Sequence, residues 1–229
     1  MRRLRTGLGG LDLALGGGIP VGRTTHLWGE GGSGKTTVAL WIAAVIAAAG
    51  VMVLYIDTEG VPLDRLAQLV DRQRGDLDRV LRRFSVASPR SLEAQELAVE
   101  RACSSASAGE TEVGLIVVDS ATALYRLCAS PLGGQECARQ SLERQLWMVA
   151  AAARDGGIPA LVTNQVKGEW RSGTLAPLCP ALFARECGVS IWAERWSGSL
   201  RRLHVEPPGP EIPGRHADLD LRCLGWVPP

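Results

Sequence analysis

The residues with the clearest chemical potential lie in one stretch near the start of the chain. Residues 29–36 read Gly-Glu-Gly-Gly-Ser-Gly-Lys-Thr and match the pattern G-x-x-x-x-G-K-[ST] in full. A short apolar run, residues 24–28, precedes them, and a helix-like segment, residues 37–49, follows. In such a setting backbone N–H groups point at phosphate oxygens, and the helix N-terminus adds the positive end of its dipole. The pattern predicts a P-loop; a Gly/Ser-rich surface turn is the alternative.

The P-loop residues have different expected roles. Lys35 is expected to reach the β- and γ-phosphates of a nucleotide, and Thr36 to place its hydroxyl on Mg²⁺. The residues predicted to bind the nucleotide are Gly29, Glu30, Gly31, Gly32, Ser33, Gly34, Lys35, Thr36 and Thr37.

A second candidate metal ligand ends an apolar run. Residues 115–118 are Leu-Ile-Val-Val, and Asp119 follows them. In a P-loop protein this pattern is typical of the Walker B strand, whose acid holds Mg²⁺ directly or through water. The alternative is a buried strand whose last residue caps the next turn.

The elements that must position these residues alternate along the chain. Strands are predicted at residues 51–56, 83–87, 115–119 and 158–163. Further helices are predicted at residues 10–15, 62–73, 91–106 and 135–153. This alternation predicts an α/β fold with a mostly parallel sheet and helices on both faces. Short segments at residues 189–194, 200–205 and 219–224 are separated by turn residues and predict antiparallel strands at one edge of the sheet.

Length and composition fit one globular domain. The 229 residues are 46% hydrophobic and 21% charged, which excludes a disordered or fibrous protein. We therefore expect a single domain over residues 1–229. The basic start is not followed by an apolar signal segment, so a cytoplasmic location is expected and no membrane partner. Because the net charge is only +1, DNA binding would require a local basic patch and would be sensitive to salt.

The six cysteines give no sign of a metal site. They form no C-x-x-C pair and have no histidines nearby at zinc-ligand spacing. We expect reduced thiols.

Five segments, taken together and in order, resemble one family. They are Thr6-Gly-Leu-Gly-Gly-Leu-Asp-Leu-Ala-Leu-Gly-Gly-Gly-Ile, the P-loop, Tyr55-Ile-Asp-Thr-Glu-Gly, Val118-Asp-Ser-Ala-Thr-Ala-Leu-Tyr-Arg and Val162-Thr-Asn-Gln-Val. They resemble the RecA-type P-loop ATPase core of the RecA/RadA recombinases over about residues 4–206. Within that family the chain looks most like the RadB branch of short archaeal RadA paralogues, because it starts at the core and lacks an N-terminal helix-hairpin-helix domain.

The resemblance implies ATP and Mg²⁺ as cofactors and gives roles to three further residues. Glu59 would orient and polarise the water that attacks the γ-phosphate, and its alternative is a solvated loop acid. Gln165 would sense the γ-phosphate and pass that state to the following loop; otherwise it is a hydrogen-bonded residue at a strand end. Arg65 resembles the arginine that stacks on adenine, and its alternative is a solvated helix arginine. The predicted catalytic residues are therefore Lys35, Glu59 and Gln165.

The resemblance also implies two DNA-facing loops. Tyr125-Arg126 would open the first, and residues 166–177 would form the second. The side chains expected to contact DNA are Arg126, Lys167, Trp170 and Arg171. Trp170 could stack on a base or cover core. Both loops are short and the aromatic polymerisation motif of full recombinases is missing, so we expect an accessory or mediator role in recombination and repair, with weak ATP hydrolysis.

We expect three partners: single-stranded DNA, which would bind weakly, a RadA-type recombinase and a second copy of this chain. Two other functions remain open from the sequence. One is a KaiC-like signalling ATPase of the same fold that works through protein partners without DNA. The other is a structural partner of a recombinase that binds nucleotide only as a folding ligand. Salt-dependent binding of DNA would favour the expected role over the signalling ATPase. ATP hydrolysis that depends on Glu59 would exclude the structural partner.

Overall fold

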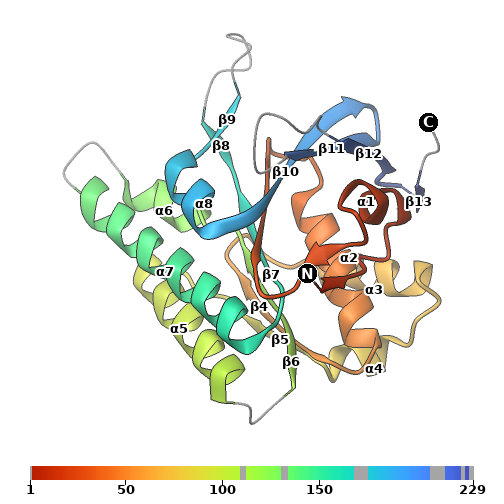
Figure 1. Ribbon diagram of the computed structural model, residues 1–229, viewed down its shortest axis with the longest axis horizontal. Coiled ribbons are helices and arrows are strands. Elements are labelled where there is room, and N and C mark those ends of the chain that lie inside the picture. The colour runs from red at the N-terminus through yellow and green to blue at the C-terminus, as the bar shows by residue number, and fades with distance from the viewer. Residues whose placement is uncertain are drawn as a thin grey trace.

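A nine-stranded sheet forms the centre of the protein (Figure 1). The computed structural model describes residues 2–108, 112–129, 134–167, 175–206, 215–222 and 225–226. The sheet has the order β13-β12-β11-β10-β3-β7-β6-β4-β5. Its strands are β3 (Thr24–Gly29), β4 (Met52–Asp57), β5 (Phe84–Ala87), β6 (Val113–Asp119), β7 (Ala160–Asn164), β10 (Cys187–Ser197), β11 (Leu200–Glu206), β12 (Arg215–Asp220) and β13 (Gly225–Trp226). Two short pairs lie outside this sheet: β1 (Arg3–Leu4) with β2 (Ile19–Pro20), and β8 (Val166–Lys167) with β9 (Ala176–Pro177).

The pairing of the strands decides where a ligand can lie. From β10 through β3, β7, β6 and β4 to β5, every neighbouring pair is parallel. The carboxyl ends of these strands therefore meet at one edge, which in open α/β sheets is where ligands bind. The P-loop, Asp57, Asp119 and Asn164 all lie at this edge, the upper one in Figure 1.

Helices cover both faces of the sheet (Figure 1). On one face lie α1 (Gly9–Ala14), α2 (Lys35–Ala48), α3 (Leu63–Arg72) and α4 (Leu77–Leu81). On the other lie α5 (Leu92–Ala108), α6 (Ala123–Cys128), α7 (Gln135–Gly156) and α8 (Pro180–Glu186). Helix α2 is apolar on nearly all sides and packs into the first core, as expected for a fully buried helix. Because both faces are covered, β3 is buried along its whole length.

The predicted fold class is confirmed, including the antiparallel strands at the C-terminal edge. β10 runs parallel to β3 and antiparallel to β11, which makes it the transition between the two parts of the sheet. The boundaries of the third predicted edge strand were wrong: β12 covers Arg215–Asp220, and residues 221–222 form a turn. The helices α4, α6 and α8 were not predicted. They have five to seven residues, and unlike the equally short helix predicted at residues 10–15 they are not directly followed by a run of glycines.

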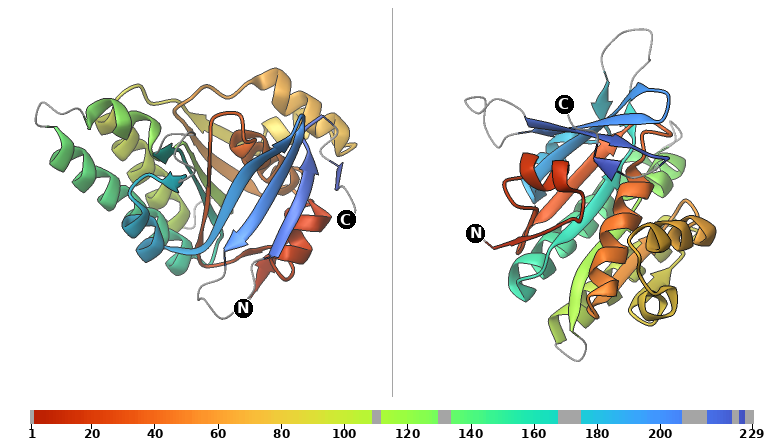
Figure 2. Two further views of the ribbon diagram at one scale, coloured as in Figure 1. Left: turned by 90° about the horizontal axis from the view of Figure 1, so that it is seen from above. Right: turned by 90° about the vertical axis from the view of Figure 1, so that its right-hand side faces the viewer.

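The C-terminal strands do more than extend the sheet. Seen from the other directions in Figure 2, β10, β11 and β12 curve over the first face, and α1 packs against β12. This curvature brings the β10–β11 hairpin and the turn after β12 to the P-loop.

Candidate functional site

The P-loop joins β3 to α2 and is shaped at two glycines. A Cβ atom on Gly29 would lie 2.3 Å from the carbonyl oxygen of Ala193 on β10, so only glycine allows the two strands to approach this closely. Gly34 is the N-cap of α2 and has a φ of 91°, a left-handed conformation that favours glycine. A side chain there would also meet Leu221. Both glycines are therefore required by the fold as well as by the motif.

Lys35 folds back over the loop that precedes it. Its Nζ atom donates to the carbonyl oxygens of Gly29 at 2.9 Å and Glu30 at 2.7 Å. Burial lowers the pKa of Lys35, and the nearby carboxylates of Glu59, Asp119 and Glu30 oppose that shift. The ammonium group is thus a buried cation facing the carboxylates of the site, held by carbonyl groups that a phosphate could replace.

The loop offers donors that suit an anion. No side chain caps the N-terminus of α2, and the N–H groups of Gly34, Lys35 and Thr36 have no hydrogen-bond partner among the described residues. The Ser33 Oγ atom is buried and lacks a hydrogen-bond partner there as well. Free N–H groups at a helix N-terminus form an anion-binding site, and a buried hydroxyl without a partner is rare in proteins. These groups fit the phosphates of a nucleotide.

The site offers few metal ligands of its own, as expected for a Mg²⁺ ion that is shared with phosphates. Within the described ranges, no group of three or more His, Cys, Asp or Glu side chains could hold a metal by itself. Mg²⁺ bound with a nucleotide needs only one or two protein ligands, because phosphates and water complete its shell. The partly buried Thr36 and the buried Asp119 are the residues that could supply them.

Asp119 is held firmly at the end of β6. Its Oδ2 atom accepts a hydrogen bond from the Tyr55 hydroxyl at 2.6 Å, and its Oδ1 atom accepts one from Thr163 Oγ1 at 2.5 Å. Tyr55 is buried, and burial followed by the charge of Asp119 raises its pKa well above the usual range. Tyr55 therefore stays a neutral donor, and the carboxylate is oriented from both sides. Neither of these two contacts was predicted from the sequence.

Asp57 shapes the loop that carries Glu59. Its Oδ1 atom accepts from the backbone N–H groups of Glu59 at 3.1 Å and Gly60 at 2.8 Å, and its Oδ2 atom accepts from that of Val61 at 2.7 Å. Asp57 itself is buried. No role was predicted for it, although an aspartate followed closely by glycine is a recognisable turn signal.

Glu59, Gln165 and Arg126 form one chain of hydrogen bonds. The Gln165 amide donates from Nε2 to Glu59 Oε1 and accepts at Oε1 from Arg126 Nη1. Glu59 and Arg126 are exposed, and Gln165 is partly buried between them. The loop after β4, helix α6 and the residue that follows β7 are thus connected through a single amide.

Buried polar groups hold the backbone of Gln165, the central residue of these hydrogen bonds. Thr122 Oγ1 accepts from the Gln165 backbone N–H at 3.1 Å and donates to Asn164 Oδ1 at 3.0 Å. Asn164 Nδ2 lies 2.9 Å from the Leu178 carbonyl oxygen and 3.1 Å from His26 Nε2. The His26 ring stacks on Phe183, and burial lowers the pKa of His26 to about 3. The imidazole is therefore neutral, and the backbone at Gln165 is fixed.

Arg65 lies on α3 and contacts the turn after β12. Its Nη2 atom donates to the Leu221 carbonyl oxygen at 2.7 Å, and its Nη1 atom donates to Gln68 at 3.0 Å. Since Leu221 also packs on Gly34, Arg65 connects α3 to the turn that covers the start of α2.

The residues predicted to contact DNA are only partly described. Arg126 and Lys167 are both exposed, on α6 and β8. Trp170 and Arg171 lie outside the described residues. In the part of the chain that the structure covers, none of the helices is long and apolar enough to cross a membrane.

Comparison with known proteins gives a consistent picture. The Rad51 family model matches residues 1–182. A protein of Halobacterium salinarum named "DNA repair and recombination protein RadB" is 33% identical over 95% of this chain and 92% of its own length. Proteins with the same name are 31% identical in Thermoplasma acidophilum, over 90% of this chain and 85% of theirs, and 33% identical in Pyrococcus furiosus, over 76% and 73%.

Proposed function

This chain belongs to the Rad51 family as a RadB-like protein, and we propose that it binds ATP with Mg²⁺, hydrolyses ATP weakly and binds DNA as an accessory factor in homologous recombination. Its RadB homologues indicate a role in DNA repair and recombination. The proposed partners are single-stranded DNA and a RadA-type recombinase, and the proposed unit is one ATPase domain spanning residues 1–229.

The phosphate site is the first part of the proposal. The free N–H groups at the start of α2 and the buried Lys35 ammonium group would bind the phosphates. Thr36 and Asp119 would hold Mg²⁺, and the ion would stabilise negative charge on the phosphoryl oxygens. Asp119 is already oriented by Tyr55 and Thr163, so little reorganisation is needed there.

Glu59 is the proposed catalytic base or water-positioning group. The three N–H groups that bind Asp57 hold the Glu59 backbone, and the Gln165 amide holds the Glu59 carboxylate. A carboxylate in a fixed position can orient water for attack on the γ-phosphate. Thr37 at the start of α2 and Arg65 beside Leu221 are proposed to contact the rest of the nucleotide.

One observation carries the proposal that DNA and ATP act on each other. The same Gln165 amide contacts Glu59 on one side and Arg126 on the other. Arg126 is exposed and would meet a DNA phosphate, as would Lys167 on β8. A DNA phosphate that binds Arg126 would compete with Gln165 for the guanidinium group and so change the contact between Gln165 and Glu59. The shared amide therefore favours the DNA-binding function over a signalling ATPase without DNA.

Binding isotherms on single-stranded oligonucleotides at several salt concentrations test this function. Because few basic side chains are available, the slope of log affinity against log salt should be shallow, on the order of two to four. Replacing Lys167, Trp170 and Arg171 together should flatten the slope, and Trp170→Ala alone should cost about 1–3 kcal/mol if the ring stacks on a base. A triple variant that binds like the parent would exclude this loop as the DNA contact, and absence of DNA binding by the parent would favour a function through protein partners.

A further inference from the structure

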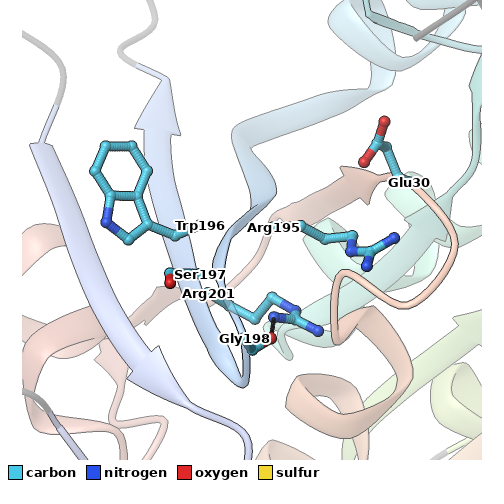
Figure 3. Close-up of a pocket in the computed structure, with 6 residues that line it drawn as sticks. All are labelled: Glu30, Arg195, Trp196, Ser197, Gly198 and Arg201. Atoms are coloured by element: carbon cyan, nitrogen blue, oxygen red, sulfur yellow. Dashed lines mark hydrogen bonds between the residues drawn. The ribbon is translucent and has the colours of Figure 1, made fainter.

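The P-loop has a cationic neighbour that its sequence motif does not include. The hairpin formed by β10 and β11 lies beside the loop and, together with Glu30, lines a cavity of about 500 Å³ (Figure 3). Arg195 on β10 is paired directly with Arg201 on β11. In Figure 3 both arginine side chains extend from the hairpin toward the P-loop, whereas Trp196 points away from it.

Arg201 is bound to main-chain carbonyl groups. Its Nε atom donates to the Gly32 carbonyl oxygen in the P-loop at 3.0 Å. Its Nη1 atom donates to the carbonyl oxygens of Gly198 and Leu200, both at 2.8 Å. Arg201 is only 8% exposed and forms no ion pair with any described carboxylate. The guanidinium group is therefore fixed to its own hairpin and extends one donor to the phosphate loop.

The contact with Gly32 fixes a peptide plane at both ends. Arg201 binds the carbonyl oxygen of Gly32, and the N–H group of the same peptide, which belongs to Ser33, donates to the Glu30 carbonyl oxygen at 3.2 Å. Because a peptide is planar, fixing its carbonyl group and its N–H group fixes its orientation. This restricts the backbone on either side of the Gly32–Ser33 peptide, including the loop that carries the free N–H groups.

We propose that Arg201 is a positioning residue of the phosphate site, which holds the P-loop in its phosphate-binding shape from the C-terminal hairpin. The inference rests on the proposed binding of nucleotide at the P-loop. Buried arginines usually pair with acids, because an unpaired buried charge is costly. Arg201 has three carbonyl oxygens in place of an acid, and the hydrogen bonds to them offset the cost of burying its charge.

The opposed arginine adds an independent argument. Like charges directly across an antiparallel pair are destabilising. Burial, followed by the charge of Arg195, lowers the pKa of Arg201. Arg195 forms no ion pair among the residues that the structure describes, and Glu30 is the acid that lines the same cavity as the two arginines. Two adjacent cations at this place are consistent with a nearby anion, the phosphates that the loop would bind.

Nucleotide titration of matched variants tests the proposal. Arg201→Gln should weaken the binding of both ADP and ATP roughly tenfold, the range expected when a charge-assisted hydrogen bond is lost. Arg202→Gln is the control: Arg202 is the next residue, pairs with Asp218 and lies over the Trp196 ring, away from the P-loop. Its nucleotide affinity should stay within about twofold of the parent.

The loss of Arg201 must weaken nucleotide binding and not only lower the stability of the fold. We expect Arg201→Gln to raise KM and leave kcat nearly unchanged, and Arg201→Lys, which keeps a charge but not the planar fork, to recover part of the affinity. If Arg201→Gln does not fold, Arg201→Lys alone is compared with the parent and must bind both nucleotides more weakly. A folded Arg201→Gln variant that binds ADP and ATP like the parent overturns the inference. Failure of the parent to bind nucleotide, with Lys35→Ala behaving identically, would instead overturn the proposed function and the inference with it.

Discussion

The proposed nucleotide site has two sides, which are held together by different kinds of contact. On the strand-end side, formed by residues 57–59, 119–122 and 163–165, buried side chains bind one another, as Asp119 does with Tyr55 and Thr163. On the C-terminal side, formed by the β10–β11 hairpin and residues 221–222, arginine side chains donate to backbone carbonyl groups, as Arg201 does to Gly32 and Arg65 does to Leu221. The first side orients the groups proposed to react, and the second maintains the shape of the loop.

The first prediction concerns His26, which lies where the two sides meet. His26 contacts Asn164 at the strand ends and Ser190 on β10. Burial lowers its pKa to about 3 from an ordinary value of 6.5. The unfolded chain therefore binds a proton at pH values where the folded protein does not. The resulting stabilisation is complete above pH 6.5 and is lost as the pH falls toward 3.

Urea unfolding of the parent and of His26→Gln at pH 7 and pH 5 measures this contribution. Between these two pH values the parent should lose about 2 kcal/mol more of its free energy of unfolding than the variant, since each pH unit below the unfolded pKa contributes about 1.4 kcal/mol. Equal losses would mean that His26 is protonated in the folded protein and that the two sides are not joined through a neutral imidazole.

The second prediction tests the strand-end side alone. Asp57→Asn removes the negative charge that binds three backbone N–H groups, so the free energy of unfolding should fall by about 1–3 kcal/mol. ATP turnover should fall more than ATP affinity, because the altered loop carries Glu59 and not the phosphate donors. Chemical denaturation and steady-state kinetics measure the two effects. Asp64→Asn, an exposed acid on α3, is the matched control; the interpretation is wrong if both variants behave alike.

The third prediction tests the C-terminal side alone. Arg65→Ala removes the hydrogen bond to the Leu221 carbonyl oxygen and should lower the free energy of unfolding by about 1 kcal/mol. Nucleotide affinity should fall as well, because Leu221 packs on Gly34 at the start of α2. Arg72→Ala, at the exposed end of the same helix, should leave both quantities unchanged. A variant with normal stability but altered preference for adenine would point to stacking on the base.

The two sides also differ in how far the sequence predicts them. The strand-end side lies within short motifs. Asp119 could be named because it ends an apolar run in a P-loop protein, whereas Glu59 and Gln165 were named through the resemblance to the recombinase family. The supporting contacts of Tyr55, Thr163 and Asp57 were not evident, since they depend on which strands are neighbours. The contact of Arg201 with Gly32 joins residues 169 positions apart and uses a backbone acceptor, which leaves no pattern of residue types.

The smallest expected effect concerns DNA. Arg126→Ala should reduce the slope of log affinity against log salt by about one and weaken all single-stranded sequences alike, as expected for one phosphate contact. Arg154→Ala is the control, because Arg154 lies in the last turn of α7 and pairs with Asp155. Binding isotherms at several salt concentrations measure the slope. An unchanged slope would place the DNA contact elsewhere and leave Arg126 with only its contact to Gln165.

The central claim is that a P-loop that binds ATP is completed by Glu59 at the strand-end side. The most direct test measures ATP binding and ATP hydrolysis in parallel for the parent and for Glu59→Gln. The amide keeps the size of the side chain but cannot polarise water as a carboxylate does, so ATP affinity should remain within a few-fold while turnover is lost. A Glu59→Gln variant that hydrolyses ATP at the parental rate would contradict the claim and require another residue to position the water.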